Sequence, residues 1–193
     1  SVDGLYHQKF KYPPETMLSH TFYETHTAEF FDFYRQKLIV HGAKPNAAHL
    51  RLAALEREGK CRAVVAQNID GLHQAAGSKT VYELHGSTLR NYCTRCGKFF
   101  PVQFIEDAAG VGDGVPRCDE CGGIVKPDVV LYEEGLDEET MENAVHAIRG
   151  ADTLIVGGTS LAVFPAAGLL RYFRGENLVV INKQPTPADA MAN

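Results

Sequence analysis

Four of the five cysteines form two closely spaced pairs, Cys93/Cys96 and Cys118/Cys121. Each Cys-x-x-Cys pair can present two thiolates to one tetrahedral zinc ion, although the 21 residues between the pairs slightly exceed the usual ribbon spacing. Four thiolates fill the coordination shell and leave no position for water or substrate, so we expect structural zinc rather than a redox disulfide or an iron–sulfur cluster. Cys61 opens an apolar stretch, where a buried and inert thiol is expected.

His85 ends the apolar run TVYEL, eight residues before the first cysteine. It could be a metal ligand, a packed core histidine or a catalytic base. Because four cysteines already complete a zinc site, His85 is not needed as a ligand. A histidine with an ordinary pKa of about 6.5 at the carboxyl end of a strand could accept a proton from a ribose hydroxyl. The residues alone leave the packing role open as well.

Polar and small residues follow three other apolar runs. Gln67, Asn68 and Asp70 form either a simple turn or a set of hydrogen-bonding groups for the carboxamide and hydroxyls of a ligand. The stretch GGTSLAVFPAAG lacks a full G-x-G-x-x-G pattern, yet small residues before a helix start can bind an anion. Asn182 lies 24 residues after Gly158, where dinucleotide-binding folds place a ribose contact.

Four short runs rich in valine and isoleucine precede these polar groups, and helical patterns separate most of them. Strands that alternate with helices favour a parallel sheet, whose ligands bind beyond the carboxyl ends of the strands. We therefore expect the four polar clusters to meet at one edge. The runs are RAVVA (62–66), TVYEL (80–84), DTLIV (152–156) and NLVVI (177–181).

Capping residues mark the helices between the runs. Pro45 and Gly59 bracket one helix, and Asp137 is the expected N-cap of another, which places Ala144 and Ile148 together with Met141 and Val145 on one face. Further helices are expected in 27–42 and 165–175, with a short helical turn in 71–77.

Residues 88–127 interrupt the alternation of strands and helices and contain all four paired cysteines. They indicate an insert in an α/β domain with a parallel sheet. Residues 87–127 hold five basic and five acidic residues, which argues against a DNA-binding ribbon. The expected organisation is a helical segment (1–44), the first part of the α/β domain (45–87), the zinc-binding insert (88–127) and the second part of that domain (128–193).

The composition is that of an ordinary globular protein of 193 residues, 45% hydrophobic and 22% charged. A formal charge of −5 without a basic cluster argues against nucleic acid as a direct partner. No apolar run approaches the roughly 20 residues that span a bilayer, so a membrane partner is not expected. The opening residues SVDGLYHQKF lack a secretion signal, and the cytoplasm is the expected location.

The chain resembles the sirtuins, the NAD-dependent protein lysine deacylases. The matching segments occur in the family's order and cover nearly the whole chain. The resemblance implies a Rossmann-like domain with a small module built from a helical insert and a four-cysteine zinc ribbon. The segments are KPNAAHLRLAALE, QNIDGLHQAAG, ELHG, the two cysteine pairs, KPDVVLYEEGL, GGTSLAVFPAAGLL and VVIN.

The resemblance also implies roles for individual residues. His85 matches the catalytic base, with Asn68 and Asp70 as further catalytic residues, and Asp70 would hold the nicotinamide carboxamide. Structural zinc and NAD as co-substrate are the implied cofactors. The implied NAD contacts are Gln67, Asn68, Ile69, Asp70, His85, Gly158, Thr159, Ser160 and Asn182, and the implied zinc ligands are Cys93, Cys96, Cys118 and Cys121.

The implied partner is an acyl-lysine protein or peptide, added as a strand between two segments of the chain. These segments contain Val129, Val130, Leu131 and Tyr132 on one side and Leu161 and Val163 on the other. Many members have Phe-Gly-Glu where this chain has YEE. Family members that favour succinyl or malonyl groups carry Tyr-x-x-Arg, whereas the matching segment offers Phe31 and Tyr34, with Arg35 one residue away. We therefore expect a preference for uncharged acyl groups.

The implied reaction transfers the acyl group to ADP-ribose with release of nicotinamide, and His85 deprotonates a ribose hydroxyl. Transfer of ADP-ribose to protein would use the same pocket and stays an alternative. A non-catalytic module that binds zinc and acyl-lysine is the alternative outside enzymes. The family opens with a strand and a Gly-Ala-Gly loop that bind the NAD diphosphate, and SVDGLYH resembles the family segment that comes directly after that loop. We expect a chain truncated at both ends, with weak NAD binding that the missing segment would restore.

Overall fold

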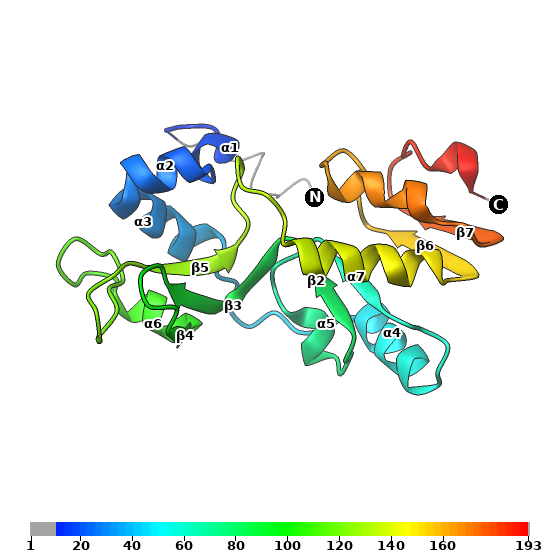
Figure 1. Cartoon of the computed structure of the whole chain (residues 1–193), viewed down its shortest axis with the longest axis horizontal. Helices are drawn as coiled ribbons and strands as arrows, with labels where there is room; N and C mark the ends of the chain where they lie inside the picture. Colours follow the sequence, from blue (N-terminus) through cyan, green and yellow to red (C-terminus); the bar gives the residue numbers. More distant parts are fainter. Residues whose placement is uncertain (1–10, 193) are drawn as a thin grey trace. The chain divides into compact units, whose positions relative to one another are not determined.

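The computed structural model describes residues 11–192, so the SVDGLYH segment lies outside the described part of the chain. The chain divides into two compact units, each built from several segments (Figure 1). No helix in 11–192 has both the length and the apolar character needed to cross a membrane. The first unit contains residues up to 44, 68–72 and 85–135, and the second contains 45–67, 73–84 and the residues from 136 onward.

Aromatic residues form the helical part of the first unit. Phe30, Phe31 and Tyr34 are at most 1% exposed, and the rings of Phe30 and Tyr34 stack with centroids 5.8 Å apart. The expected helix in 27–42 ends earlier, at Lys37, and Gly42 follows in the loop with a φ of 69°. The helices are α1 (Pro14–Met17), α2 (His20–Thr25) and α3 (Thr27–Lys37).

A three-stranded antiparallel sheet with the order β4-β3-β5 forms the rest of the first unit. Gly86 begins β3 with a φ of 75°, and a Cβ atom there would lie 1.9 Å from the carbonyl oxygen of Asp128. Only glycine allows β3 to approach β5 this closely. Val125 and Ile105 pack the core at 0% exposure. The elements are β3 (Gly86–Cys93), β4 (Phe99–Pro101), α6 (Val102–Asp107) and β5 (Val125–Val129).

The strands of the second unit are parallel, as the alternating pattern predicts, but they form two separate two-stranded sheets instead of one. β1 pairs with β2, and β6 pairs with β7. Helix α7 packs its predicted face into a core of Leu84, Ala144, Ile148 and Leu169. The elements are α4 (Ala47–Arg57), β1 (Val64–Ala66), α5 (Leu72–Ala75, of which Leu72 belongs to the first unit), β2 (Val81–Glu83), α7 (Glu138–Arg149), β6 (Thr153–Gly157), η2 (Ala166–Tyr172), β7 (Asn177–Ile181) and η3 (Asp189–Met191).

Two expectations for this unit differ from the structure. The helix expected in 165–175 is the 3-10 helix η2. The segment LAVF (161–164), expected as a peptide-pairing strand, is irregular, because the N–H of Leu161 donates to Thr159 Oγ1 and Leu161 has a φ of 52°. A positive φ is incompatible with an extended strand.

Candidate active site and zinc site

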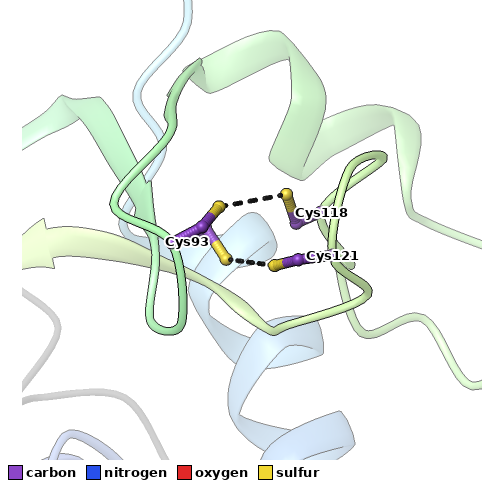
Figure 2. Close-up of side chains that lie close together, drawn as sticks. Cys93, Cys118 and Cys121 are labelled. Atoms are coloured by element: carbon purple, nitrogen blue, oxygen red, sulfur yellow. Dashed lines mark hydrogen bonds between the residues drawn. The ribbon is translucent and has the colours of Figure 1, made fainter.

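The four paired cysteines converge at one end of the antiparallel sheet. Figure 2 shows Cys93, Cys118 and Cys121 with their sulfur atoms turned toward one another. The four Sγ atoms lie within 4.8 Å of one another, with Cys93 and Cys121 at 3.3 Å and Cys96 and Cys118 at 3.7 Å. Tetrahedral zinc with Zn–S bonds of about 2.3 Å places its sulfur ligands about 3.8 Å apart. The donor set and its spacing therefore fit a structural zinc ion.

The surroundings of Cys93 favour its thiolate form, whereas the pKa values of Cys96 and Cys121 are raised, because their bonds to neighbouring thiols outweigh the backbone N–H groups of Lys98 and Gly123. Burial opposes ionisation of Cys93, but the backbone N–H groups of Cys96 and Arg95 outweigh it and lower the pKa of Cys93 to about 6. Cys61 is not part of the group, and burial raises the pKa of its thiol, as expected for an inert cysteine. The group of possible metal ligands among the described residues consists of the four cysteines, without His85.

His85 lies between β2 and β3, where the chain passes from one unit to the other. Its backbone is fixed, because its carbonyl accepts a hydrogen bond from the N–H of Val130 at 3.0 Å. The side chain is half-buried, so the imidazole is neither sealed in the core nor fully solvated. This setting is compatible with a catalytic base that meets a ligand.

The loop of residues 68–70 lies beside the start of β3. The carbonyl of Ile69 accepts hydrogen bonds from Thr88 N at 3.0 Å and Thr88 Oγ1 at 3.2 Å. The carboxylate of Asp70 accepts from the N–H of Leu72 at 3.0 Å, which orients it at the start of α5. Asn68 is exposed. The polar loop predicted after β1 is therefore held against Thr88, three positions beyond His85 in the chain.

The carboxyl ends of β1 and β6 come together within the second unit. Gln67 Nε2 donates to Thr159 Oγ1 at 3.3 Å. The N–H of Gly158 donates to the carbonyl of Ile181 at 3.0 Å, which places the 158–160 segment beside Asn182. The Asn182 amide donates to the carbonyl of Gln184 at 2.9 Å. Gly158, Thr159, Ser160 and Asn182 thus share the edge that the alternating pattern predicts.

The predicted peptide-binding segment 129–132 leaves the strand β5 at Val129. The N–H groups of its next three residues all donate within the chain, from Val130 to the carbonyl of His85, from Leu131 to the carboxylate of Glu134 and from Tyr132 to the carbonyl of Leu18. The carbonyls of Val129, Leu131 and Tyr132 also accept hydrogen bonds within the chain, from Lys126 Nζ, Glu134 N and His20 N.

Sequence reasoning missed Glu134, which holds this segment in place. Glu134 accepts from Leu131 N at 2.8 Å, His20 Nδ1 at 2.8 Å and Lys126 Nζ at 3.2 Å, and its side chain is 21% exposed. Burial opposes its ionisation, but these donors together lower its pKa. His20 lies over one hundred positions away in the chain, so no local pattern could have indicated the contact.

The His20→Gln variant should be less stable than the wild type in weakly acidic solution and nearly equal to it in alkaline solution. The hydrogen bond to Glu134 raises the pKa of His20 above its ordinary value of 6.5. Because the folded state raises this pKa, protonated His20 stabilises the fold. That stabilisation is complete below the unfolded-state pKa of His20 and is lost as pH rises through its folded-state pKa. Urea midpoints measured at about pH 6 and about pH 9 check this. An equal loss at both values would contradict the ion-pair account.

Phe31 and Tyr34, the predicted acyl contacts, are both 0% exposed in the aromatic core of the first unit. No exposed part of either ring is available to an acyl group in this arrangement. Burial raises the pKa of Tyr34, and no described group forms a hydrogen bond with its hydroxyl. Arg35 donates to the carbonyls of Ile105 at 3.3 Å and Gly114 at 2.9 Å, so it ties α3 to the cysteine-containing segment.

Comparison with known proteins agrees with this geometry. The Sir2 family model matches residues 1–165. A protein from Clostridium acetobutylicum named NAD-dependent protein deacetylase is 60% identical over 195 residues, which cover 100% of this chain and 78% of the relative. A protein of the same name from Staphylococcus aureus (strain Mu50) is 43% identical over 194 residues, which cover 100% of this chain and 78% of that protein.

Solved structures show the same likeness in three dimensions. The structure described as Sir2 bound to acetylated peptide has a TM-score of 0.87 and 38% identity, over 96% of this chain and 79% of that one. The Sir2–p53 peptide–NAD+ complex has a TM-score of 0.85 and 38% identity, over 96% of this chain and 78% of that one. Sequence and structure therefore agree that this chain belongs to the Sir2 family.

Proposed function

We propose that this chain is an NAD-dependent protein lysine deacetylase. The observation that carries the proposal is the TM-score of 0.87 with a Sir2 bound to acetylated peptide, over 96% of this chain. Relatives named NAD-dependent protein deacetylase cover the whole chain at up to 60% identity. Related structures hold a p53 peptide with NAD+ and a propionylated peptide. An acyl-lysine peptide is accordingly the substrate class we assign.

The polar strand ends supply groups suited to NAD. The hydrogen-bonded pair of Gln67 and Thr159, with Gly158 and Ser160, would hold the ribose and phosphates, and Asn182 would hold the adenosine ribose. NAD supplies a ribose carbon whose bond to nicotinamide breaks as the acyl oxygen attacks. Asp70, already oriented by the N–H of Leu72, would hold the carboxamide. These groups orient the reactants and account for a large part of the rate.

His85 would then take the proton from a ribose hydroxyl. A general base must lie within hydrogen-bond reach of the proton it takes, and a half-buried imidazole leaves part of its ring accessible to a ribose hydroxyl. The hydrogen bond from Val130 to the His85 carbonyl holds the backbone that carries the imidazole. Asn68, exposed in the neighbouring loop, would complete the catalytic set by orienting the ribose or a water molecule.

The direct test incubates the chain with NAD and an acetyl-lysine peptide and follows nicotinamide and deacetylated peptide together. Equal amounts of both products, absent without NAD, are the expected result. Nicotinamide released with ADP-ribose attached to protein would instead indicate ADP-ribose transfer. Binding of the peptide with no product in the presence of NAD would contradict the assignment as an enzyme.

Acetyl-lysine peptides should be turned over at least about tenfold faster than succinyl-lysine peptides, because a carboxylate brought into a site without a cationic partner carries a desolvation penalty. Arg35, the nearest arginine to the predicted acyl contacts, is bonded to the carbonyls of Ile105 and Gly114. Values of kcat/KM for acetyl, propionyl and succinyl versions of one peptide check this. The propionyl peptide controls for size, and faster removal of succinyl would overturn the expectation.

A further inference from the structure

The first unit contains a hollow of about 500 Å³, and apart from Tyr132 none of its lining residues has a role assigned above. It is lined by residues in and next to α1 and α2, by Tyr132, the last residue of the proposed peptide-pairing segment 129–132, and by Glu133, which follows it. All of the lining residues belong to the first unit. The hollow therefore adjoins the place where the substrate peptide is proposed to pair.

Aromatic rings form much of the wall of this hollow. Tyr12 packs edge-on against Phe22 with ring centroids 5.6 Å apart, and Phe22 stacks on His26 at 4.7 Å. Tyr132, on the opposite segment, is 40% exposed. Phe22 is only 4% exposed, and Lys11 Nζ lies 5.1 Å from the centroid of the Tyr12 ring, so Tyr132 is the ring with the most exposed surface. An exposed ring face of this kind attracts a cationic head group and packs against an aliphatic stem.

Two carboxylates, Glu15 and Glu133, complete the lining, and no lysine or arginine is among the described lining residues. Glu133 is firmly placed, because its Oε2 accepts from Thr21 N at 2.8 Å and Thr21 Oγ1 at 2.7 Å. These bonds from Thr21 lower the pKa of Glu133, so it is ionised near neutral pH.

The backbone conformation of Glu133 is a separate observation that supports a role for its side chain. Glu133 has a φ of 77°, a region in which glycine is the favoured residue and a β-carbon costs roughly 1 kcal/mol. The chain keeps a carboxylate there despite that cost. The hydrogen bonds to Thr21 then fix this carboxylate at the edge of the hollow.

We propose that this hollow is a specificity subsite that takes the side chain of an arginine or lysine flanking the acyl-lysine in the substrate. The proposal rests on the proposed deacetylase function. The stem of the basic residue packs against Tyr132 and Tyr12, and its charge lies toward Glu15 and Glu133. The enzyme consequently selects acyl-lysines in basic stretches of sequence.

The test compares acetyl-lysine peptides in which one flanking position carries either arginine or its uncharged isostere citrulline. Peptide affinity is measured by fluorescence anisotropy, and kcat/KM is measured with NAD. At the flanking position whose side chain enters the hollow, arginine should improve peptide affinity about threefold to tenfold over citrulline at low salt. The gain is modest because the charge pairs with Glu15 and Glu133 are partly solvated. The gain should shrink as salt is raised.

Removal of the two carboxylates should abolish this preference. In the E15Q/E133Q double variant, the arginine and citrulline peptides should bind equally, whereas E138Q/E139Q, the same charge change on two exposed residues of α7, should keep the preference. E133G is a second variant that relieves the left-handed backbone while removing the carboxylate, and it should lose most of the gain without loss of folding.

An arginine advantage that survives in the double variant, or no advantage at any position, would overturn the subsite. Failure of the deacetylase proposal would look different. In that case, no peptide would be deacetylated in the presence of NAD, while the anisotropy comparison would still report whether the hollow selects a basic side chain.

Discussion

His85→Ala should abolish deacetylation, by about a hundredfold to ten-thousandfold, while the zinc content stays at that of the wild type. The loss follows from removal of the group proposed to accept the ribose proton. Zinc should stay because the four sulfur atoms that can bind it lie together without His85. Initial rates of nicotinamide release and metal analysis of the same preparation give the two readouts.

Two further variants make this prediction specific. His85→Tyr should also be inactive, because a phenol near its ordinary pKa of about 10 is a poor base at neutral pH. His146→Ala removes an exposed histidine of α7 and should behave as the wild type. Turnover at the wild-type rate in His85→Ala would remove His85 from the mechanism, and loss of zinc in that variant would indicate disruption of the fold.

Local patterns predicted the elements whose signals lie within a few residues. Asp137 caps α7 as expected, with the N–H of Thr140 donating to its carboxylate at 2.8 Å. Gly59 lies just past α4 with a φ of 72°, the left-handed geometry that ends many helices. The parallel strand pairs followed from apolar runs separated by helices. Caps and periodicity are local, so one sequence is enough to see them.

The features that sequence reasoning missed depend on contacts between distant segments. Tyr132 forms an isolated parallel bridge with Ser19, a residue more than one hundred positions earlier in the chain. Glu133 bonds to Thr21 across more than one hundred positions. Arg35, considered in the sequence only for its place beside the predicted acyl contacts, bonds to the carbonyl of Gly114, 79 positions away. None of these pairs has a periodic or motif signal, because tertiary packing alone brings the partners together.

The candidate site was predictable to a greater extent than the segments that support it. Gln67, Asn68 and Asp70 are polar residues directly after a strand, and that placement has few explanations besides a turn or a ligand site. The cysteine spacing likewise led to a cluster of sulfur atoms. In contrast, Phe31 and Tyr34 were chosen by resemblance, and the structure places both in the core, since aromatic side chains on α3 are mainly packing residues.

Cys118→Ser should remove zinc and unfold much of the first unit. A structural zinc site in small domains is worth about 10–16 kcal/mol of apparent binding energy, and loss of one thiolate forfeits most of the folding energy that the metal supplies. Cys118 is 4% exposed and belongs to the same buried cluster as Cys93 and Val125, so the sheet and the metal site depend on each other. The expected result is less than one zinc per chain and a large drop in Tm.

Cys61→Ser is the matched control, because Cys61 lies outside the four-sulfur group and its Sγ makes only a weak contact with the carbonyl of Ala63 at 3.5 Å. It should keep its zinc and lose little stability. A chelator should lower the Tm of the wild type toward that of Cys118→Ser and leave Cys118→Ser itself unchanged. Full zinc occupancy with an unchanged Tm in Cys118→Ser would mean that three thiolates suffice, and the closed four-thiolate site would have to be abandoned. Since the segment 129–134 continues directly from β5, loss of the zinc should also weaken peptide binding, although no cysteine belongs to the proposed active site.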